Sequence, residues 1–281
     1  AFGERLIETI GTDEIEAWRA GLTSVTSLRG EDDPELRRAL ANSSKNRIVV
    51  LLHGILSRAV KVYCLPSNPV SGVERHPVRM TGDIEVFSPE EVWALVRAAA
   101  SEQDGAIYLT AAFTGLRRSE LLALRWRDID FAGCTTRVRA SYADGALTTP
   151  KSGKVRAVPL APEVALALRR LAARPRFTSA DDLVFVGEAG SYSDGSALRR
   201  RYQSALAQAA LRPLRFHDLR HTFGTRMIAK ADIRRVQEWM GHADIHTTMR
   251  YLHYAPREED ARLVAWWPRR SQSELPVDQR R

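Results

Sequence analysis

The stretch RFHDLRHTFGTRM, residues 215–227, holds side chains that could bind a phosphate, ligate a metal ion or only pack. At about 100° per residue, its apolar side chains share one narrow face of a helix. That face is predicted to be buried and consists of Phe216, Leu219, Phe223 and Met227. His217 and Arg220 lie together beside it, as residues at the edge of a cleft do, and Gly224 on the same side leaves room for a ligand. His221 points further round the helix.

Three roles for His217 and Arg220 compete. A zinc site is poorly supported, because the stretch lacks the glutamate of a His-Glu-x-x-His helix and suggests no third ligand. A structural pair bonded to neighbouring carbonyls is the usual outcome for an isolated histidine and arginine. A phosphate site needs further cations from elsewhere in the chain.

A first partner stretch is FTGLRRSELLALRW, residues 113–126. Gly115 is predicted to end one helix, and the next begins at about Arg118. Arg117 therefore lies at a helix amino-terminus, where free backbone N–H groups and the helix dipole favour an anion. An arginine on a solvated helix end is the ordinary alternative.

A second partner stretch is GHADIHTTMRYLH, residues 241–253, which follows an amphipathic helix that Gly241 is predicted to end. A buried face is predicted for Ile245, Met249 and Leu252. Tyr251 lies about 120° from that face, so it is not expected to be a core residue. Surface tyrosines are ordinary, and this position alone assigns no function.

Composition indicates a globular protein. Apolar residues make up 44% and charged residues 27% of the 281 residues, which suits a soluble chain rather than a disordered or membrane one. The densest aliphatic run, residues 48–52, is too short to span a bilayer, and no signal peptide is visible. The two cysteines, Cys64 and Cys134, imply no disulfide framework and no cysteine zinc site, so a reducing cytoplasm is expected.

The net charge of +8 is unevenly distributed. The first 36 residues hold three basic and nine acidic side chains, so the positive charge lies in the remainder. This distribution favours a polyanion as partner. An arginine-rich proteome explains the same excess equally well.

The first 83 residues are predicted to form a helical unit that ends in a linker. Short and long helices are expected at residues 13–20 and from Ser43 or Ser44 to Tyr63. The predicted buried face of the long helix consists of Ile48, Leu51, Leu52, Ile55, Leu56, Ala59 and Val62. Residues 65–87, rich in proline and glycine, are predicted to be the linker, with the domain boundary near residue 83. The chain begins with Ala1 instead of methionine, so a preceding segment is expected to be missing.

Residues 84–268 are predicted to form a second, mixed unit, followed by a flexible tail over residues 269–281. Helices are expected at residues 89–102, with Ser88 and Glu91 as a capping box, and at 105–114, 118–125, 162–173 and 195–210. Strands are expected at 135–142, 146–160 and 182–186, the middle stretch forming a hairpin that turns at Ser152–Gly153. The expected fold is mainly α with a small antiparallel β-sheet.

In order along the chain, these motifs resemble the tyrosine recombinase family, which comprises phage integrases and Xer-type site-specific recombinases. The motifs are TGLRRSE, PKSGKVRAVPL, HDLRH, and GH nine residues before the tyrosine of TTMRY. The resemblance covers residues 87–254 and, more loosely, the helical unit before them. It departs at the front, where the helical unit is short. The resemblance implies a helical core-binding domain followed by a catalytic domain.

The chemistry of phosphodiester cleavage accounts for these residue types. Arg117 and Arg220 can form bidentate bonds to the non-bridging phosphate oxygens and remain charged. His242 can add a donor, and His217 is placed to manage the proton of the nucleophile. Tyr251 is expected to attack phosphorus and leave a 3′-phosphotyrosyl link.

The leaving deoxyribose oxygen needs a proton, which a hairpin lysine supplies in the family. The resemblance assigns that role to Lys151, with Lys154 as the alternative, and Glu120 is expected to orient an arginine. The covalent link conserves the bond energy, so no cofactor is expected, neither ATP nor metal. The acidic alternation at residues 128–130 favours a strand-entry turn over a two-metal nuclease centre.

Double-stranded DNA is the expected partner, clamped mostly through phosphate contacts. The residues expected to make those contacts are Lys45, Arg47, Lys154, Arg199, Arg200 and Arg215. Two alternatives remain, a DNA-binding regulator that has lost catalysis and a type IB topoisomerase. Retention of the reactive residues argues against the first, and the Xer-like motifs and separate helical domain argue against the second.

Residues 257–267 are predicted to form a short helix with an apolar cluster of Leu263, Val264, Trp266 and Trp267. Such a helix must dock, either on its own domain or on a neighbouring subunit. The family favours docking in trans, which closes a homo-tetramer on paired DNA sites. Without DNA a monomer or weak oligomer is expected, with a cytoplasmic, nucleoid-associated location and no membrane contact.

Overall fold

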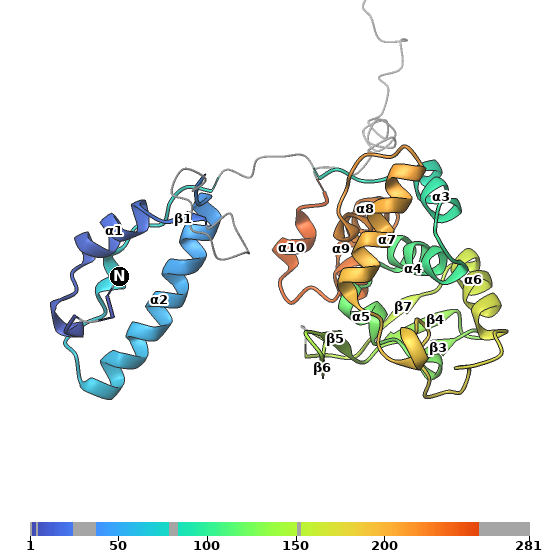
Figure 1. Ribbon diagram of the computed structural model, residues 1–281, viewed down its shortest axis with the longest axis horizontal. Coiled ribbons are helices and arrows are strands. Elements are labelled where there is room, and N and C mark those ends of the chain that lie inside the picture. Colours follow the sequence, from blue (N-terminus) through green and yellow to red (C-terminus); the bar gives the residue numbers. More distant parts are fainter. Residues whose placement is uncertain (1, 4, 25–37, 79–83, 151–152, 253–281) are drawn as a thin grey trace, which may run out of the picture. The chain divides into compact units, whose positions relative to one another are not determined.

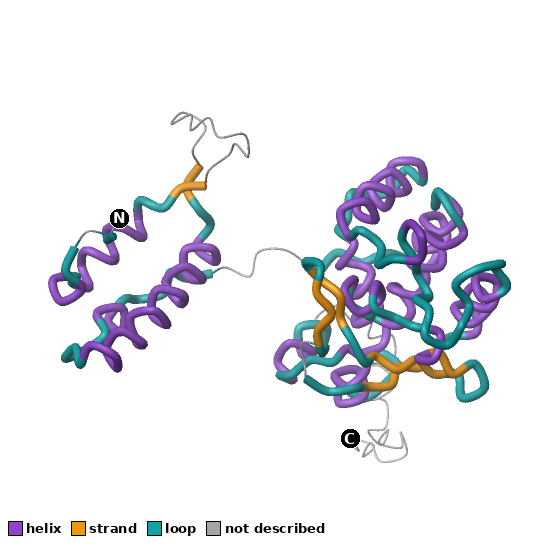
Figure 2. The backbone as a smooth tube through the Cα atoms, turned by 60° about the horizontal axis from the view of Figure 1, so that its bottom comes forward, coloured by secondary structure: helices purple, strands orange, loops and turns teal. Residues whose placement is uncertain are grey.

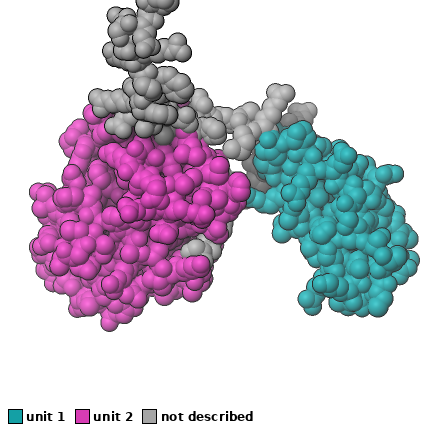
Figure 3. All heavy atoms as spheres, turned by 180° about the vertical axis from the view of Figure 1, so that it is seen from behind, with its two compact units in different colours: residues 1–82 teal, residues 83–281 magenta. Residues whose placement is uncertain are grey.

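The structure is a computed structural model, and it describes residues 2–3, 5–24, 38–78, 84–150 and 153–252 of the 281-residue chain. The chain divides into two compact units, residues 1–82 and 83–281, which Figure 3 shows in separate colours. Among the described helices, none combines the length and the apolar character needed to cross a membrane.

The first unit is built on two helices, α1 (Thr12–Ala20) and α2 (Asn42–Tyr63). A short 3-10 turn (Ile7–Thr9), a two-residue strand pair β1 (Thr23–Ser24) and β2 (Arg38–Ala39), and a second 3-10 turn (Pro69–Gly72) complete it. Its small core consists of Ile10, Ile15, Val49, Leu56, Val70 and Val73. The helical character predicted for this unit is confirmed.

The buried face predicted for α2 is correct for Leu56 and Ala59 and wrong for Leu51, Ile55 and Val62. Leu51, Ile55 and Val62 are exposed, whereas Val49, Leu56 and Ala59 are buried together with Lys45. Residues 48–62 are apolar on most of the helix circumference, so the spacing fits more than one stripe. The stripe that packs against α1 and the second 3-10 turn is the one that is buried.

The second unit is mainly helical (Figure 1). Its helices are α3 (Pro89–Arg97), α4 (Glu102–Thr114), α5 (Arg118–Leu122), α6 (Pro162–Ala172), α7 (Gly195–Gln208), α8 (Phe216–Ile228), α9 (Ile233–Met240) and α10 (Ile245–Met249). The capping box predicted for Ser88 and Glu91 is present. Helix α4 begins three residues earlier than predicted, because the Ser101 hydroxyl accepts a hydrogen bond from the backbone N–H of Asp104.

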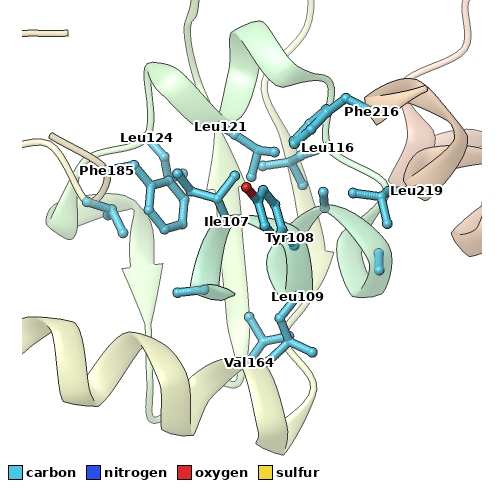
Figure 4. Close-up of a cluster of buried hydrophobic side chains, with 14 of the residues drawn as sticks. Ile107, Tyr108, Leu109, Leu116, Leu121, Leu124, Val164, Phe185, Phe216 and Leu219 are labelled. Carbon is cyan, nitrogen blue, oxygen red and sulfur yellow. The ribbon is translucent and has the colours of Figure 1, made fainter. Parts of the chain in front are cut away.

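Helix α4 runs through the core of this unit and is buried over nearly its whole surface. Figure 4 shows Ile107, Tyr108 and Leu109 of α4 surrounded by apolar side chains from α5, α6 and α8. Helix α4 contacts α3, α6 and α8. The rigid packing of α4 and α8 matters for function, because α4 ends next to Arg117 and α8 carries His217, Arg220 and His221.

The strands are short and antiparallel (Figure 2). One sheet has the order β3 (Ile129–Asp130), β4 (Thr135–Val138), β7 (Arg156–Pro159), and a separate pair consists of β5 (Ser141–Ala143) and β6 (Ala146–Thr148). The mainly α fold with small antiparallel sheets is confirmed.

Two of the strand predictions are wrong, one on pairing and one on the presence of a strand. Strand β6 pairs with β5 across a turn at Asp144–Gly145, and β7 pairs with β4, so residues 146–160 do not form one hairpin turning at Ser152–Gly153. Residues 182–186 are not a strand and contribute isolated bridges at Leu183 and Val186. Asp144 and Gly145 both have positive φ, which a tight hairpin turn requires.

Candidate active site

Arg117 lies at the amino-terminal end of α5 and is held by three hydrogen bonds to two groups, Glu120 and the carbonyl of Gly241. Its Nη1 donates to Oε1 of Glu120 at 2.9 Å, and its Nη2 donates to the carbonyl of Gly241 at 3.0 Å. The backbone N–H of Arg117 donates to Oε2 of Glu120 at 2.8 Å. Glu120 therefore bonds both the side chain and the backbone of Arg117, and its role in orienting that arginine for catalysis stays a prediction.

Arg220 on α8 is buried, with 2% of its surface exposed. Its Nη1 donates to the carbonyl of Gly115 and its Nη2 to the carbonyl of Met240. Burial and the positive charge of Arg117 lower the pKa of Arg220 to about 9, so the guanidinium remains charged at neutral pH. Arg220 and the partly exposed Arg117 bring two positive charges together, and Glu120 supplies one negative charge beside them, so the excess positive charge favours binding of an anion.

The carboxyl end of α9 anchors three guanidinium groups. The carbonyls of Trp239, Met240 and Gly241 accept hydrogen bonds from Arg156, Arg220 and Arg117 in that order. The last carbonyls of a helix have no partner within the helix, and its dipole is negative at this end. The end of α9 thus fixes cations that would repel one another.

Arg156 is a site residue that the sequence interpretation missed. Its Nη1 and Nη2 donate to the two oxygens of Glu120 at 2.9 and 2.7 Å, and its Nε donates to the carbonyl of Trp239 at 2.8 Å. Glu120 is 1% exposed, and burial raises its pKa. Hydrogen bonds and charge from Arg156 and Arg117 outweigh burial, so the pKa of Glu120 lies below its ordinary value.

Arg156→Ala is expected to lower the free energy of unfolding by about 3 kcal/mol, because it removes one partner of a buried ion pair. Because the pKa of Glu120 is lowered, its ion pairs stabilise the fold above the ordinary pKa of 4.5 and this contribution is lost as the pH falls. The variant should therefore lose less stability than the wild type on acidification. Urea unfolding of the full chain by circular dichroism at neutral and acidic pH measures both effects.

The control for this prediction is Arg127→Ala, which removes an exposed ion pair with Asp181. An exposed pair contributes only about 0–1 kcal/mol. If both variants unfold at the same urea concentration, the ion pairs of Glu120 do not stabilise the unit.

Tyr251 is buried, contrary to the prediction that it lies off the core. It is 3% exposed and packs with Phe223, Val236 and Met240. The face predicted to be buried is also wrong, since Met249 is 43% exposed and Thr248 is fully buried. Helix α10 ends at Met249, so spacing measured along one continuous helix does not reach Tyr251.

The ring of Tyr251 lies against the backbone of α8. A Cβ atom built on Gly224 would be 2.7 Å from Cζ of Tyr251, closer than side chains approach one another. The space that Gly224 leaves, which was predicted to admit a ligand, holds the tyrosine. Its hydroxyl lies 2.9 Å from Nδ1 of His221.

His217 is exposed at the amino-terminal end of α8 and does not hydrogen-bond Tyr251. Its ring centroid is 4.8 Å from that of His221, edge to face. Although the residue is exposed, partial desolvation of its ring and the charge of Arg220 lower the pKa of His217. His217 therefore lies one helical turn before the residue that contacts the phenol.

His242 follows the end of α9 and stacks parallel to Tyr251, with 6.3 Å between ring centroids. Its Nδ1 lies 2.9 Å from the Thr248 hydroxyl. Burial and the charges of Arg220 and Arg117 lower the pKa of His242 to about 3, so the ring is neutral at neutral pH. With the Thr248 hydroxyl as donor, Nε2 carries the hydrogen and can donate to a phosphate.

An open hollow of about 920 Å³ lies beside these residues. Arg117, His217, Arg199 and Arg215 are among its lining residues, together with apolar side chains of α7. Arg200 is exposed but is not part of this lining. Arg215 is 78% exposed at its side chain and pairs with Asp218. The hollow therefore joins the basic residues Arg199 and Arg215 to Arg117 and His217.

The other residues predicted for the site either are not among those that the structure brings to Arg117 and Arg220 or fall outside the described residues. Lys151 falls outside the described residues, as do residues 257–281, and Lys154 and Arg47 are exposed. Lys45 was predicted to contact DNA, but its side chain is not available for that contact. It is 8% exposed and its Nζ donates to the carbonyl of Ala20 at 2.7 Å, so its charge is used within the first unit.

The described residues include no group of three or more histidine, cysteine, aspartate or glutamate side chains arranged to hold a metal ion. His217, His221 and His242 contact aromatic rings or hydroxyls instead. The groups gathered at this site are three anchored guanidiniums, three imidazoles and one phenol. This set can bind a phosphate and present an oxygen nucleophile to it.

Residues 85–258 match the model of the phage integrase family. The chain is 32% identical to tyrosine recombinase XerC of Xanthomonas axonopodis pv. citri, over 78% of this chain and 70% of the relative. It is 27% identical to a XerC-like tyrosine recombinase of Caldanaerobacter subterraneus, over 71% of this chain. That match spans 56% of the relative, little more than half its length.

The fold resembles solved structures of DNA complexes. The structure of the Tn1549 transposon integrase with transposon right end DNA superposes with a TM-score of 0.69 at 21% identity, covering 92% of this chain and 86% of that one. A lambda integrase dimer bound to a core site gives a TM-score of 0.63 at 17% identity, covering 90% of this chain and 83% of that one. At these identities the likeness concerns the fold.

Proposed function

The chain belongs to the phage integrase family, and on that premise we propose that it is a tyrosine-type site-specific DNA recombinase. It cuts a DNA strand through a 3′-phosphotyrosyl link to Tyr251 and rejoins the strand to a new partner. The observation that carries the proposal is the convergence of Arg117, Arg220 and Tyr251 around the end of α9.

The two guanidiniums provide charge for the transition state. Arg117 and Arg220 use their Nη atoms on protein groups, but each Nη carries two hydrogens, so both side chains retain donors for a phosphate. Donors fixed in advance stabilise the charge that gathers on the non-bridging oxygens without reorganising. His242 adds a further donor through Nε2, and His217 faces the hollow where the phosphate enters.

The nucleophile and the leaving group need opposite proton transfers. As the Tyr251 oxygen forms its bond to phosphorus it loses a proton, and as the bond to the deoxyribose 5′-oxygen breaks that oxygen gains one. We assign the second transfer to Lys151, on the match of PKSGKVRAVPL to the family motif. Neither transfer consumes a cofactor.

DNA binding is proposed to follow the hollow beside α7. Arg199 and Arg215 line it and are placed to contact phosphates on the way to Arg117. Arg47, Lys154 and Arg200 are exposed and are proposed as further phosphate contacts. The XerH and lambda integrase structures, which are similar in fold, are DNA complexes, and this supports the proposal of DNA as the partner.

Assembly and location form the finer part of the proposal. Four copies are proposed to act on two DNA sites, with residues 257–267 docking on a neighbouring subunit, and the free protein is a monomer or weak oligomer. A nucleoid-associated location follows from the DNA substrate. Light scattering of complexes on paired sites measures the stoichiometry, and complexes of two subunits would contradict the tetramer.

Covalent capture of DNA tests the proposed activity. In a duplex with a nick a few nucleotides beyond the cleavage position, attack releases a short oligonucleotide that carries the 5′-hydroxyl. This oligonucleotide diffuses away, so the strand cannot be rejoined and the protein stays attached to the 3′ end. We expect a protease-sensitive adduct on denaturing gels with a cognate site and none with an unrelated duplex. Binding without an adduct would indicate a regulator, and relaxation of supercoiled DNA of any sequence would indicate a topoisomerase.

A further inference from the structure

His221 is the described side chain that hydrogen-bonds the nucleophile. Its Nδ1 lies 2.9 Å from the hydroxyl of Tyr251, and the two ring centroids are 5.8 Å apart. Tyr251 is 3% exposed, so the contact lies within the packed unit. His217, which sequence spacing favoured for managing this proton, contacts the ring of His221 instead.

The backbone of α8 accounts for this contact. His221 and Gly224 are three residues apart on α8, so they lie on neighbouring turns of the same side. Gly224 admits the phenol ring against the helix, since a Cβ atom there would lie within 2.9 Å of three ring carbons. His221 then meets the hydroxyl. One helix thus fixes both the plane of the ring and the direction of its oxygen.

The surroundings of His221 keep its ring uncharged. Burial and the neighbouring His217 lower the pKa of His221 to about 4, and the other charged groups near it are Asp218, Arg215 and Arg250. A neutral imidazole carries one N–H and one acceptor nitrogen. In the tautomer that carries its hydrogen on Nε2, Nδ1 is the acceptor and the phenol donates to it; this is the tautomer from which His221 can take up a proton.

Two other groups near the phenol are less suited than His221 to accept its proton. His242 stacks on Tyr251, and its Nδ1 contacts the Thr248 hydroxyl. Arg220 has no lone pair to accept a proton. Burial raises the pKa of Tyr251 above its ordinary value, so the phenol does not ionise unaided near neutral pH.

We propose that His221 is a catalytic residue that accepts the phenolic proton of Tyr251 during strand cleavage. The proposal rests on the proposed recombinase function. As the phenolic oxygen bonds to phosphorus, its O–H bond breaks and the proton passes to Nδ1 of His221. The bond from phosphorus to the 5′-oxygen breaks, and that oxygen takes a proton from the general acid. Rejoining reverses both transfers, and His221 returns its proton to Tyr251.

His221→Asn separates proton transfer from positioning. The asparagine oxygen can occupy about the place of Nδ1 and accept the hydrogen bond, but it does not take up a proton near neutral pH. General acid–base catalysis contributes about 10²–10⁴-fold, so we expect single-turnover capture of nicked DNA to slow by about that factor. DNA affinity should not change. His221→Ala should slow capture at least as much.

The pH profile provides a second readout. Without an internal base the phenol must lose its proton to solvent, so capture by His221→Asn should accelerate about tenfold per pH unit over pH 6–8, while the wild type stays nearly flat above the His221 pKa of about 4. The matched control is His246→Asn, which makes the same change on an exposed histidine of α10 and should match the wild type.

The outcomes are distinct. Capture by His221→Asn at the wild-type rate and with a flat pH profile would show that the contact only positions the tyrosine. Faster capture would show that His221 restrains the nucleophile. Either result overturns this proposal while leaving the recombinase function in place. A wild-type protein that captures no DNA overturns both.

Discussion

Tyr251→Phe is expected to abolish covalent DNA capture while leaving the fold and DNA binding intact. Phenylalanine keeps the ring that packs over Gly224 and against Phe223, Val236 and Met240, so the core is preserved. The lost hydroxyl costs one hydrogen bond to His221, about 1 kcal/mol. The same hydroxyl is the proposed nucleophile, so no bond to phosphorus can form. Denaturing gels of nicked-duplex reactions, together with gel shifts, measure capture and binding.

Tyr254→Phe is the matched control, because this second tyrosine lies three residues further along the chain. It should capture DNA as the wild type does. An adduct that survives in Tyr251→Phe and disappears in Tyr254→Phe would show that the nucleophile has been assigned to the wrong tyrosine.

Lys151→Ala is expected to slow cleavage of ordinary DNA by about 10²–10⁴-fold, the usual contribution of a general acid. Cleavage should recover to near the wild-type rate on DNA whose bridging 5′-oxygen is replaced by sulfur. A thiolate leaves without protonation, so the missing acid no longer matters. Rates of adduct formation on matched oxygen and sulfur duplexes measure the recovery.

Arg117→Ala and Arg220→Ala are the contrasting variants. Each removes donors for the non-bridging oxygens, and loss of one such donor costs about 10²–10³-fold. Sulfur at the bridging position does not replace those donors, so neither variant should recover. Equal recovery of all three variants, or recovery of Lys154→Ala in place of Lys151→Ala, would overturn the assignment of the general acid.

Local signals in the sequence correctly predicted the helix ends and the helix face on which several site residues lie. Glycines at 115 and 241 end α4 and α9 with positive φ, as expected, and so place Arg117 and His242 just beyond helix ends. Helical spacing along α8 placed His217 and Arg220 on one side of a core face whose members Phe216, Leu219 and Phe223 are buried. These signals depend on backbone conformation within one element.

The contacts that cross between elements were not predictable in the same way. Arg156 looks like an ordinary strand residue, and only the packing of β7 beside α9 and α5 brings it to Glu120 and Trp239. His221 was placed away from the cleft by its angle on α8. That angle carries no information about the chain beyond α10, which folds back and brings Tyr251 to it.

Errors in the predicted burial have a related cause. Tyr251 and the apolar stripe of α2 were judged from spacing along a single helix, but α10 ends before Tyr251 and α2 is apolar on several faces. Which face is buried depends on the partner that covers it. A periodic pattern indicates that one face of a helix is buried. The neighbouring elements determine which face that is.

Three successive peptide carbonyls, at Trp239, Met240 and Gly241, hold the guanidiniums of Arg156, Arg220 and Arg117. Every amino acid has the same backbone carbonyl, so these three hydrogen-bond acceptors are present whatever the side chains at positions 239 and 240. Point mutations there can alter packing without removing an acceptor. Insertions and deletions act differently, because one residue more or less in α9 shifts every acceptor relative to its arginine. Relatives should therefore keep the length of the segment from α9 to the nucleophile even where the residue types at 239 and 240 change, with position 240 remaining apolar because Met240 is buried.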